Sequence, residues 1–346
     1  MAWWNKDKYV DKKPFLNARN KVKSALRNWF ELEGFTEIET SQLQKSPGNE
    51  THLLGLKTLW NSPTGENYDL YFATSPEFSC KKLIAAGENK IFEFARVFRN
   101  GEIGPLHAPE FTMLEWYCAN QDWHDIIKDT LQICKAAANA NHAQFYSWKN
   151  HKIDINAEPI WISVSGAFAK FANLDLASAI DDDGIGRRDI FVQMAQNIGI
   201  NIDDTDDWSD IFTKVLVAKI EPFLGLEAPT ILYEYPLEEG ALARRLGHDC
   251  RFVERFELYI CAVEIANGFG ELTNPIEQHE RFEAAMKKQK QIYGYAYPID
   301  EDLLDALAQM PQTSGVALGL ERLIMLVSGA RKIEDVLWTP FPINGD

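Results

Sequence analysis

The sequence predicts an α+β fold in which helices flank an antiparallel sheet. Strand patterns are joined by hairpin turns, helical patterns lie before, between and after them, and the regular strand–helix alternation of a doubly wound fold is missing. The chain of 346 residues is 46% apolar and 25% charged, which is enough to bury a substantial core. We expect one domain over residues 1–346, with a helical insertion at about 161–225.

Helical and strand patterns follow one another irregularly along the first 141 residues. Gly34 ends the first helical pattern, in which apolar side chains recur among Lys and Arg. Ser75 and Pro76 are typical of a helix start, because Ser is a favourable N-cap and Pro is tolerated in the first turn. A stretch rich in Gly, Pro, Asn and Ser predicts a loop, with room for one short strand, at 43–67. The other predicted elements are a helix at 15–33, strands at 35–40 and 68–74, a helix at 75–87, an antiparallel pair of strands at 90–99 and 110–119, and a helix at 123–141.

The second half begins with helical patterns and acidic turns, which carry no motif that can be tied to chemistry. Strand character returns at 230–235 and at 252–272, where a turn near Ile260 and Cys261 would fold the longer segment into two strands. A helix is expected at 277–293. A short strand from Ser314 then leads into a final helix after Gly319.

The composition excludes several classes of protein. With 35 basic and 51 acidic residues, the formal charge of −16 opposes broad contact with nucleic acid and favours a basic protein partner. The five cysteines form no C-x-x-C pair, so neither a zinc site nor a disulfide framework is indicated. No apolar run is long enough to span a bilayer, and the first residues do not form a secretion signal. We therefore expect a cytoplasmic protein without membrane contact.

The first group of residues with potential chemistry lies in the predicted hairpin. Arg99 at a strand end, His107 in the connecting loop and Phe111 on the returning strand could grip a phosphate and stack a base. The usual glycine-rich phosphate-binding loops do not occur. If a nucleotide is bound, residues such as these would have to hold its phosphates. The alternative is an ordinary amphipathic hairpin with surface arginines.

The second group consists of Glu257, Glu264 and Glu271. If the chain turns near residue 260, Glu257 and Glu264 face each other across two strands, where like charges repel unless a cation lies between them. Magnesium is the natural candidate, since it prefers carboxylates together with phosphates. The alternative is a solvated acidic face, although an unpaired carboxylate would be costly in the apolar surroundings of Glu264.

The third group lies at the predicted strand and helix near the end of the chain. Gly315 and Gly319 allow close approach of the backbone, and the helix start would aim free N–H groups and Arg322 at a ligand. The alternative is a strand of small residues packed against a helix.

In this order the three groups resemble motifs 2 and 3 of class II aminoacyl-tRNA synthetases of the lysine subgroup, with the carboxylate strand between them. Residues 15–40 resemble motif 1, and the most specific segments are 98–115 and 264–272. Within the subgroup, the closer resemblance is to the family of lysyl-tRNA synthetase-like ligases that attach β-lysine to elongation factor P. Motif 1 begins within the first two dozen residues, which leaves no room for an anticodon-binding domain before it, and Ala317 stands where the tRNA synthetases have glycine.

This resemblance implies that the chain uses ATP and Mg²⁺ to activate lysine or (R)-β-lysine as an acyl-adenylate, and that it transfers the acyl group to a lysine of elongation factor P. It also implies a homodimer, and tRNA is not the expected acceptor. The implied catalytic residues are Arg99 and Arg322. The implied ATP contacts are Arg99, Asn100, Glu102, His107, Phe111, Glu264, Ile265, Gly319 and Arg322. The implied amino acid contacts are Ser75, Pro76, Glu77, Tyr117, Glu271 and Ala317, and the implied magnesium ligands are Glu257 and Glu264.

Three positions depart from the family pattern, and two other functions stay open. Gly101 replaces a glutamate, for which Glu102 would have to substitute, Ala108 replaces an asparagine, and Ser41 replaces the proline of motif 1. The first alternative function is that of a truncated lysyl-tRNA synthetase-like enzyme that charges tRNA or a small acceptor. The second is that of a non-catalytic regulator that binds lysine or a nucleotide.

Overall fold

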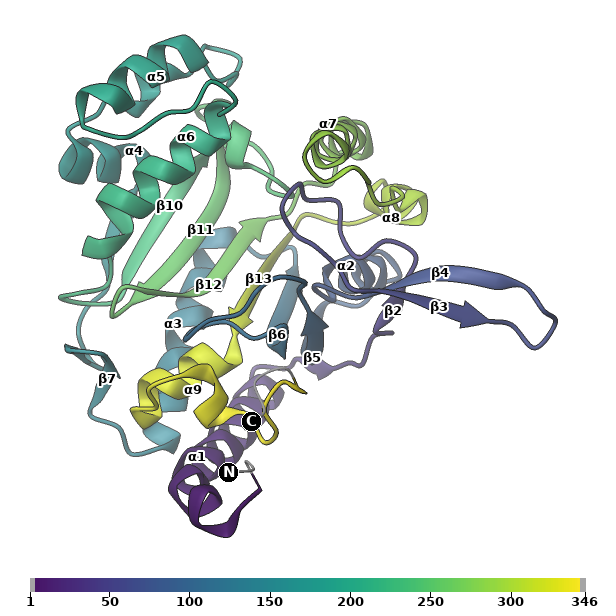
Figure 1. The fold of residues 1–346 in the computed structure, drawn as a ribbon, viewed down its shortest axis with the longest axis vertical. Coiled ribbons are helices and arrows are strands. Elements are labelled where there is room, and N and C mark those ends of the chain that lie inside the picture. Colours follow the sequence, from purple (N-terminus) through teal and green to yellow (C-terminus); the bar gives the residue numbers. More distant parts are fainter. Residues whose placement is uncertain (1–3, 343–346) are drawn as a thin grey trace.

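The computed structural model describes residues 4–342 (Figure 1). Its strands are β1 (Thr36–Glu37), β2 (Leu43–Gln44), β3 (Lys57–Asn61), β4 (Asn67–Phe72), β5 (Lys90–Phe98), β6 (Glu110–Ala119), β7 (Phe145–Trp148), β8 (His151–Asp154), β9 (Ile160–Ser163), β10 (Thr230–Pro236), β11 (Phe252–Ile260), β12 (Val263–Gly270) and β13 (Thr313–Gly319). Its α-helices are α1 (Lys6–Leu32), α2 (Glu77–Ala85), α3 (Trp123–Ala140), α4 (Val164–Ala167), α5 (Arg188–Asn197), α6 (Trp208–Val215), α7 (Pro275–Tyr293), α8 (Glu301–Leu307) and α9 (Leu320–Ser328). None of the helices within this range is long and apolar enough to cross a bilayer.

The predicted α+β class is confirmed. In residues 4–342, eight strands form the main sheet in the order β1-β5-β6-β13-β12-β11-β10-β9. The strands from β5 to β10 in this order pair antiparallel, whereas the edge strands β1 and β9 pair parallel to their neighbours. The pairing of β5 with β6 forms the hairpin that the sequence predicts.

Successive side chains of a strand point to opposite faces of the main sheet, and the two faces pack against different helices. Leu114 and Trp116 of β6 are fully buried in the main hydrophobic core. On this face α1, α3 and α9 pack against one another (Figure 1). The alternating residue Tyr117 packs instead with Cys80 and Ile84 of α2. The face of β6 that turns toward α2 is therefore available for a site.

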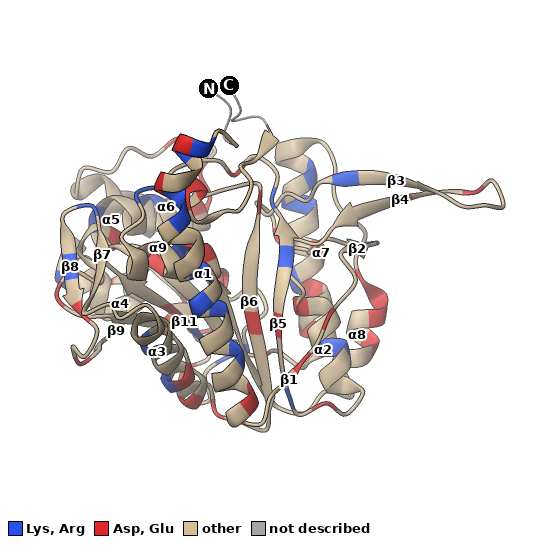
Figure 2. Cartoon of the chain, turned by 90° about the horizontal axis from the view of Figure 1, so that it is seen from below, with Lys and Arg blue, Asp and Glu red and all other residues tan. Residues whose placement is uncertain are grey.

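Three expectations for the N-terminal part are wrong. Helix α1 begins at Lys6 rather than at residue 15, because the Asn5 side chain caps it by accepting from the Asp7 backbone N–H, and because the helix accommodates Pro14. The strand expected at 35–40 is reduced to β1. The loop expected at 43–67 contains β2 and β3, which pair with β4 in a separate sheet, and β3 and β4 project from the body of the molecule (Figures 1 and 2).

The segment expected as a helical insertion at 161–225 begins differently from the prediction. Its first residues belong to β9, which pairs parallel to β10 in the main sheet. Helices α4, α5 and α6 follow, together with short π and 3-10 turns. Phe168, Phe191 and Phe212 of this segment are buried in the same core as the main sheet. The β7–β8 pair and α8 have no counterpart in the sequence prediction.

Candidate active site

Most of the residues that were expected to contact ATP line a cavity of about 140 Å³. It is bounded by the end of β5, the following loop, and residues of β6, β12, β13 and α9. Asn100 does not line it: this residue is exposed, and its backbone N–H donates to the carbonyl oxygen of Leu54 at 2.7 Å. The predicted residues that do line it are Arg99, Glu102, His107, Phe111, Glu264, Ile265, Ala317, Gly319 and Arg322.

Arg99, directly after β5, and Phe111 of β6 lie on the hairpin side of this cavity. The guanidinium carbon of Arg99 is 5.4 Å from the centroid of the Phe111 ring. Arg99 Nε donates to the Thr74 carbonyl oxygen at 3.4 Å, and its Nη1 is 3.8 Å from Glu102 Oε1. These long contacts leave guanidinium N–H groups for an anion in the cavity.

Arg322 lies on the opposite side of the cavity, in the first turn of α9. Its Nη1 donates to the Glu264 carbonyl oxygen at 2.9 Å and contacts Glu264 Oε2 at 3.3 Å. Its Nη2 donates to His107 Nε2 at 2.8 Å. Burial, and then the positive charge of Arg322, lower the pKa of His107, so its imidazole is neutral and can accept this bond.

The expected arrangement of Glu257 opposite Glu264 is wrong. The turn lies at Cys261 and Ala262, one residue later than predicted, so that Ile260 pairs with Val263. Glu257 therefore lies opposite Asn267, while Glu264 lies opposite Tyr259. The two carboxylates still act on each other, because burial and then the charge of Glu257 raise the pKa of Glu264.

The residues around these carboxylates fit a magnesium ion only together with a nucleotide. Glu257 is engaged by Arg255 and by the Tyr259 hydroxyl, each at 2.7 Å, whereas Glu264 keeps an oxygen without a close contact. Asn267 Oδ1 lacks a hydrogen-bond partner and its residue lines the same cavity. Within residues 4–342 no group of three or more His, Cys, Asp or Glu side chains is arranged to hold a metal ion. Phosphate oxygens would have to complete an oxygen ligand set of the kind that Mg²⁺ prefers.

A buried lysine joins two of the residues that were expected to contact the amino acid. Lys81 Nζ lies 2.6 Å from Glu77 Oε1 and 2.6 Å from Glu271 Oε2, and the Lys81 side chain is fully buried. Burial raises the pKa of Glu271 to about 7; Lys81 opposes this rise and Glu77 adds to it. Lys81 was missed from the sequence. Its signal was the Glu77–Lys81 spacing on a predicted helix, which is normally a surface pair.

Glu115 is a second site residue that the sequence analysis missed. It is buried on β6, where it accepts from the Ser75 hydroxyl at 2.5 Å and from the Tyr117 hydroxyl at 2.6 Å. Burial, and then the charge of Glu77, raise the pKa of Glu115 to about 8. Ser75 also accepts from the Glu77 backbone N–H at 3.0 Å, which fixes the start of α2 after Pro76. The available signal was a carboxylate between the apolar residues Leu114 and Trp116 of a predicted strand.

Gly315 of β13 makes room for this polar pocket. A Cβ atom at Gly315 would lie 2.4 Å from Glu271 Oε1 and 2.4 Å from Tyr117 Cε1. Gly319 is different, because a Cβ there would approach only the Arg322 side chain, at 3.4 Å. Ala317 lies between the two glycines, pairs with Glu115 and Asn267, and lines the cavity. Small residues on β13 thus separate the polar pocket from the cavity.

Comparison with known proteins identifies the family. The model of a family described as tRNA synthetases class II (D, K and N) matches residues 8–344. The chain belongs to the class II tRNA synthetases. The resemblance drawn from the motifs is confirmed, and the chain is a ligase of this class.

The curated relatives of this class II synthetase include proteins named elongation factor P–(R)-β-lysine ligase. The one from Salmonella arizonae is 35% identical over 327 residues, which cover 94% of this chain and 94% of the relative. Proteins of the same name from Salmonella dublin and Salmonella paratyphi B are each 34% identical over the same extent.

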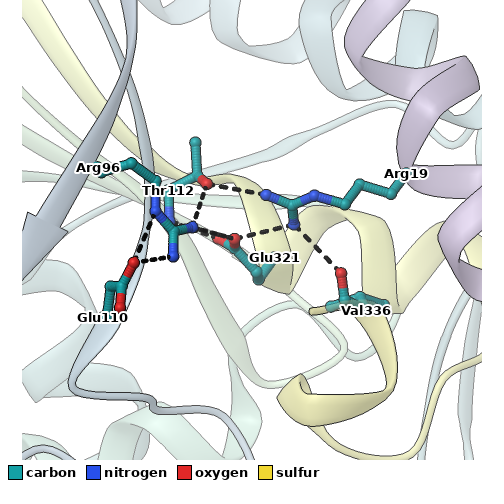
Figure 3. Close-up of polar contacts among 6 residues, drawn as sticks. All are labelled: Arg19, Arg96, Glu110, Thr112, Glu321 and Val336. Carbon is teal, nitrogen blue, oxygen red and sulfur yellow. Dashed lines mark hydrogen bonds and ion pairs between the residues drawn. The ribbon is translucent and has the colours of Figure 1, made fainter. Parts of the chain in front are cut away.

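The class II synthetase site is supported from behind by a buried ionic network (Figure 3). Glu321, next to Arg322, accepts from the Thr112 backbone N–H at 3.1 and 3.0 Å and from Arg19 Nη1 of α1 at 2.9 Å. Arg19 Nη2 donates to Thr112 Oγ1 at 2.8 Å. Thr112 follows Phe111, so the network joins both sides of the cavity to α1.

Replacement of Glu321 by Gln should destabilise the fold strongly, because it leaves the buried Arg19 without its counter-charge. We expect the free energy of unfolding to fall by roughly 3–5 kcal/mol, measured by urea denaturation. Glu110→Gln is the matched control, since Glu110 forms a half-exposed pair with Arg96, and should cost less than about 1 kcal/mol. Equal stability of the Glu321→Gln and wild-type proteins would contradict the importance of this network.

Proposed function

We propose that the protein activates lysine or (R)-β-lysine with ATP as an acyl-adenylate and transfers the acyl group to a lysine side chain of elongation factor P. The names of the relatives support the acceptor and the amino acid. The charge of the polar pocket supports the amino acid independently, and it is the observation that carries the proposal.

The polar pocket has a charge deficit that a dication would fill. Glu77 and Glu271 share the single ammonium of Lys81, and the charge of Glu77 acts on Glu115, so full ionisation of the three carboxylates would leave two negative charges without a partner. The raised pKa values of Glu115 and Glu271 reflect this crowding in a buried place. Lysine and β-lysine each carry two ammonium groups, which would satisfy both charges.

Two carboxylates of the pocket, Glu77 and Glu271, would each bind one ammonium group of the amino acid. Glu77 would bind the amino group near the reacting carboxylate, beside Ser75 and Pro76. Glu271 and Tyr117 would bind the side-chain ammonium. A buried carboxylate selects for a ligand with an ammonium group, because an analogue without that group would leave the carboxylate unpaired. Ala317 would shape the wall on which the two isomers differ.

The activation step requires positioning and charge stabilisation rather than a nucleophilic side chain. A carboxylate oxygen of the substrate attacks the α-phosphorus of ATP and forms a bond to it, the bond from that phosphorus to the β-phosphate bridging oxygen breaks, and pyrophosphate leaves. Arg99 would hold the α-phosphate and Arg322 the γ-phosphate, with Phe111 stacked on adenine. Asn100, Glu102, His107, Ile265 and Gly319 would complete the nucleotide contacts. Glu257 and Glu264 would hold Mg²⁺, which when bound neutralises phosphate charge.

We also propose a cytoplasmic homodimer that does not use tRNA. The family resemblance of residues 15–40 to motif 1 supports the dimer, and the identity of the expected acceptor, a translation factor, supports the location. The acidic net charge of −16 favours a protein acceptor over tRNA.

Arg99→Ala should abolish the exchange of label between pyrophosphate and ATP in the presence of lysine. The loss should be roughly 10²-fold or more, because the variant lacks a cation at the developing charge. Circular dichroism and the melting temperature should stay those of the wild type. Arg27→Ala is the matched control, because Arg27 pairs with Glu37 near the surface and lies outside the cavity. Retained exchange in Arg99→Ala would refute the role of Arg99.

Gly315→Ala should weaken lysine binding with little effect on ATP. The added methyl group would displace Glu271 or Tyr117, and such overpacking costs about 1–3 kcal/mol, or roughly tenfold in the KM for lysine. The KM values of both substrates in pyrophosphate exchange test this. Gly247→Ala serves as the control, since a Cβ there meets no atom within 4 Å. An unchanged KM for lysine in Gly315→Ala would remove the polar pocket from the lysine-binding site.

A further inference from the structure

A second cleft, of about 580 Å³, is lined in part by Arg255, which contacts Glu257, but none of its lining residues takes part in the proposed activation step. Its wall includes residues 49–53 of the loop between β2 and β3, parts of α7, and Arg255 of β11. The loop lies beside α7 and α2 (Figure 1). The proposed function requires an entrance for a protein acceptor, and this cleft is wide enough for an extended lysine side chain.

The backbone around Glu50 is firmly held. Asn49, which is buried, donates from Nδ2 to the Pro298 carbonyl oxygen at 3.1 Å, and Gln289 Nε2 of α7 donates to the Glu50 carbonyl oxygen at 3.4 Å. On the other side, the Leu54 carbonyl oxygen accepts from the backbone N–H of Asn100, next to Arg99. The loop is thereby fixed against the end of the strand that carries Arg99.

The Glu50 carboxylate, in contrast, is unengaged. The residue is exposed to the cleft, and within residues 4–342 its carboxylate has neither a hydrogen bond nor an ion pair. An acid on a fixed backbone without a partner is available to a ligand.

Charged groups of the active site act directly on this carboxylate. Desolvation by the protein around it, and then the negative charge of Glu77, raise the pKa of the Glu50 carboxyl. The positive charges of Arg99, Arg255 and Lys81 oppose this rise. The geometry agrees with this: Glu50 and Arg255 line the same cleft, and Arg255 Nη2 donates to Glu257 at 2.7 Å. A raised pKa also makes a carboxylate a better base near neutral pH.

Transfer to a lysine has a requirement that transfer to a hydroxyl group does not share. A lysine side chain is protonated at neutral pH, and only on the order of one in 10³ is a neutral nucleophile. The ammonium must lose a proton close to the acyl-adenylate before its nitrogen can attack. A carboxylate at the mouth of the site can both attract the ammonium and accept the proton.

We propose that Glu50 binds the ammonium of the acceptor lysine and removes its proton for attack on the acyl-adenylate. This inference rests on the proposed function. One proton passes from the ammonium to the Glu50 carboxylate, and the nitrogen lone pair forms a bond to the acyl carbon. The bond from that carbon to the phosphate oxygen then breaks, and AMP leaves with the electron pair. The second proton passes from nitrogen to the departing phosphate.

Glu50→Gln tests this role, because it keeps the shape of the side chain and removes the base. Transfer to elongation factor P in single-turnover assays should slow by roughly 10²–10⁴-fold. Pyrophosphate exchange, which needs no acceptor, should continue. Discharge of the adenylate by hydroxylamine, a small nucleophile that is neutral at neutral pH, should also continue, and Glu50→Asp should recover part of the transfer rate.

The matched control is Glu280→Gln, since Glu280 is exposed on α7 and lines the same cleft; its transfer rate should equal that of the wild type. Wild-type transfer by Glu50→Gln, or equal slowing of transfer and hydroxylamine discharge, would overturn the proposal. Failure of the wild-type protein to exchange pyrophosphate would instead overturn the proposed function, so the two failures can be told apart.

Discussion

The buried ammonium of Lys81, between Glu77 and Glu271, is the interaction on which the site depends. It ties α2 to the end of β12 and brings together two carboxylates that would otherwise repel each other in a place without solvent. Loss of one partner from such a buried arrangement costs roughly 3–5 kcal/mol. The same ammonium leaves the pocket short of positive charge. A single side chain therefore joins the elements around the pocket and, under the proposed function, determines the charge of the ligand that the pocket accepts.

Because successive side chains of a strand point to opposite faces of the sheet, residues that stabilise the site lie next in sequence to residues that line it. On β6, Thr112 meets Arg19 behind the sheet, whereas Phe111 on the other face lines the cavity. On α9, Glu321 binds Arg19 of the buried network while it also borders the cavity, and Arg322 lines the cavity beside it. Because supporting and functional residues are neighbours in the chain, disturbance of the network would be transmitted to the cavity over one peptide unit.

The sequence alone predicted those parts of the molecule in which local pattern and tertiary structure agree. The β5–β6 hairpin and the strand and helix around Gly319 were confirmed within two residues, because alternation and glycine signals were strong there. The turn after β11 was misplaced, since Cys261 and Ala262 both adopt positive φ without the usual Asn-Gly signature. Backbone bonds to Gly225 and Leu224, remote in sequence, hold that turn. Lys81 was overlooked because only the tertiary structure buries it, and Glu50 because it lies in a segment that resembled an irregular loop.

The most direct measurement is the intact mass of elongation factor P, and in parallel of lysine tRNA, after incubation with the protein, ATP, Mg²⁺ and either lysine isomer. We expect elongation factor P to gain the mass of one lysyl group and tRNA to gain none. The isomer that gives the faster gain identifies the preferred substrate. A gain on tRNA alone, or on neither acceptor, would contradict the central claim that this class II synthetase chain is a protein-lysine ligase.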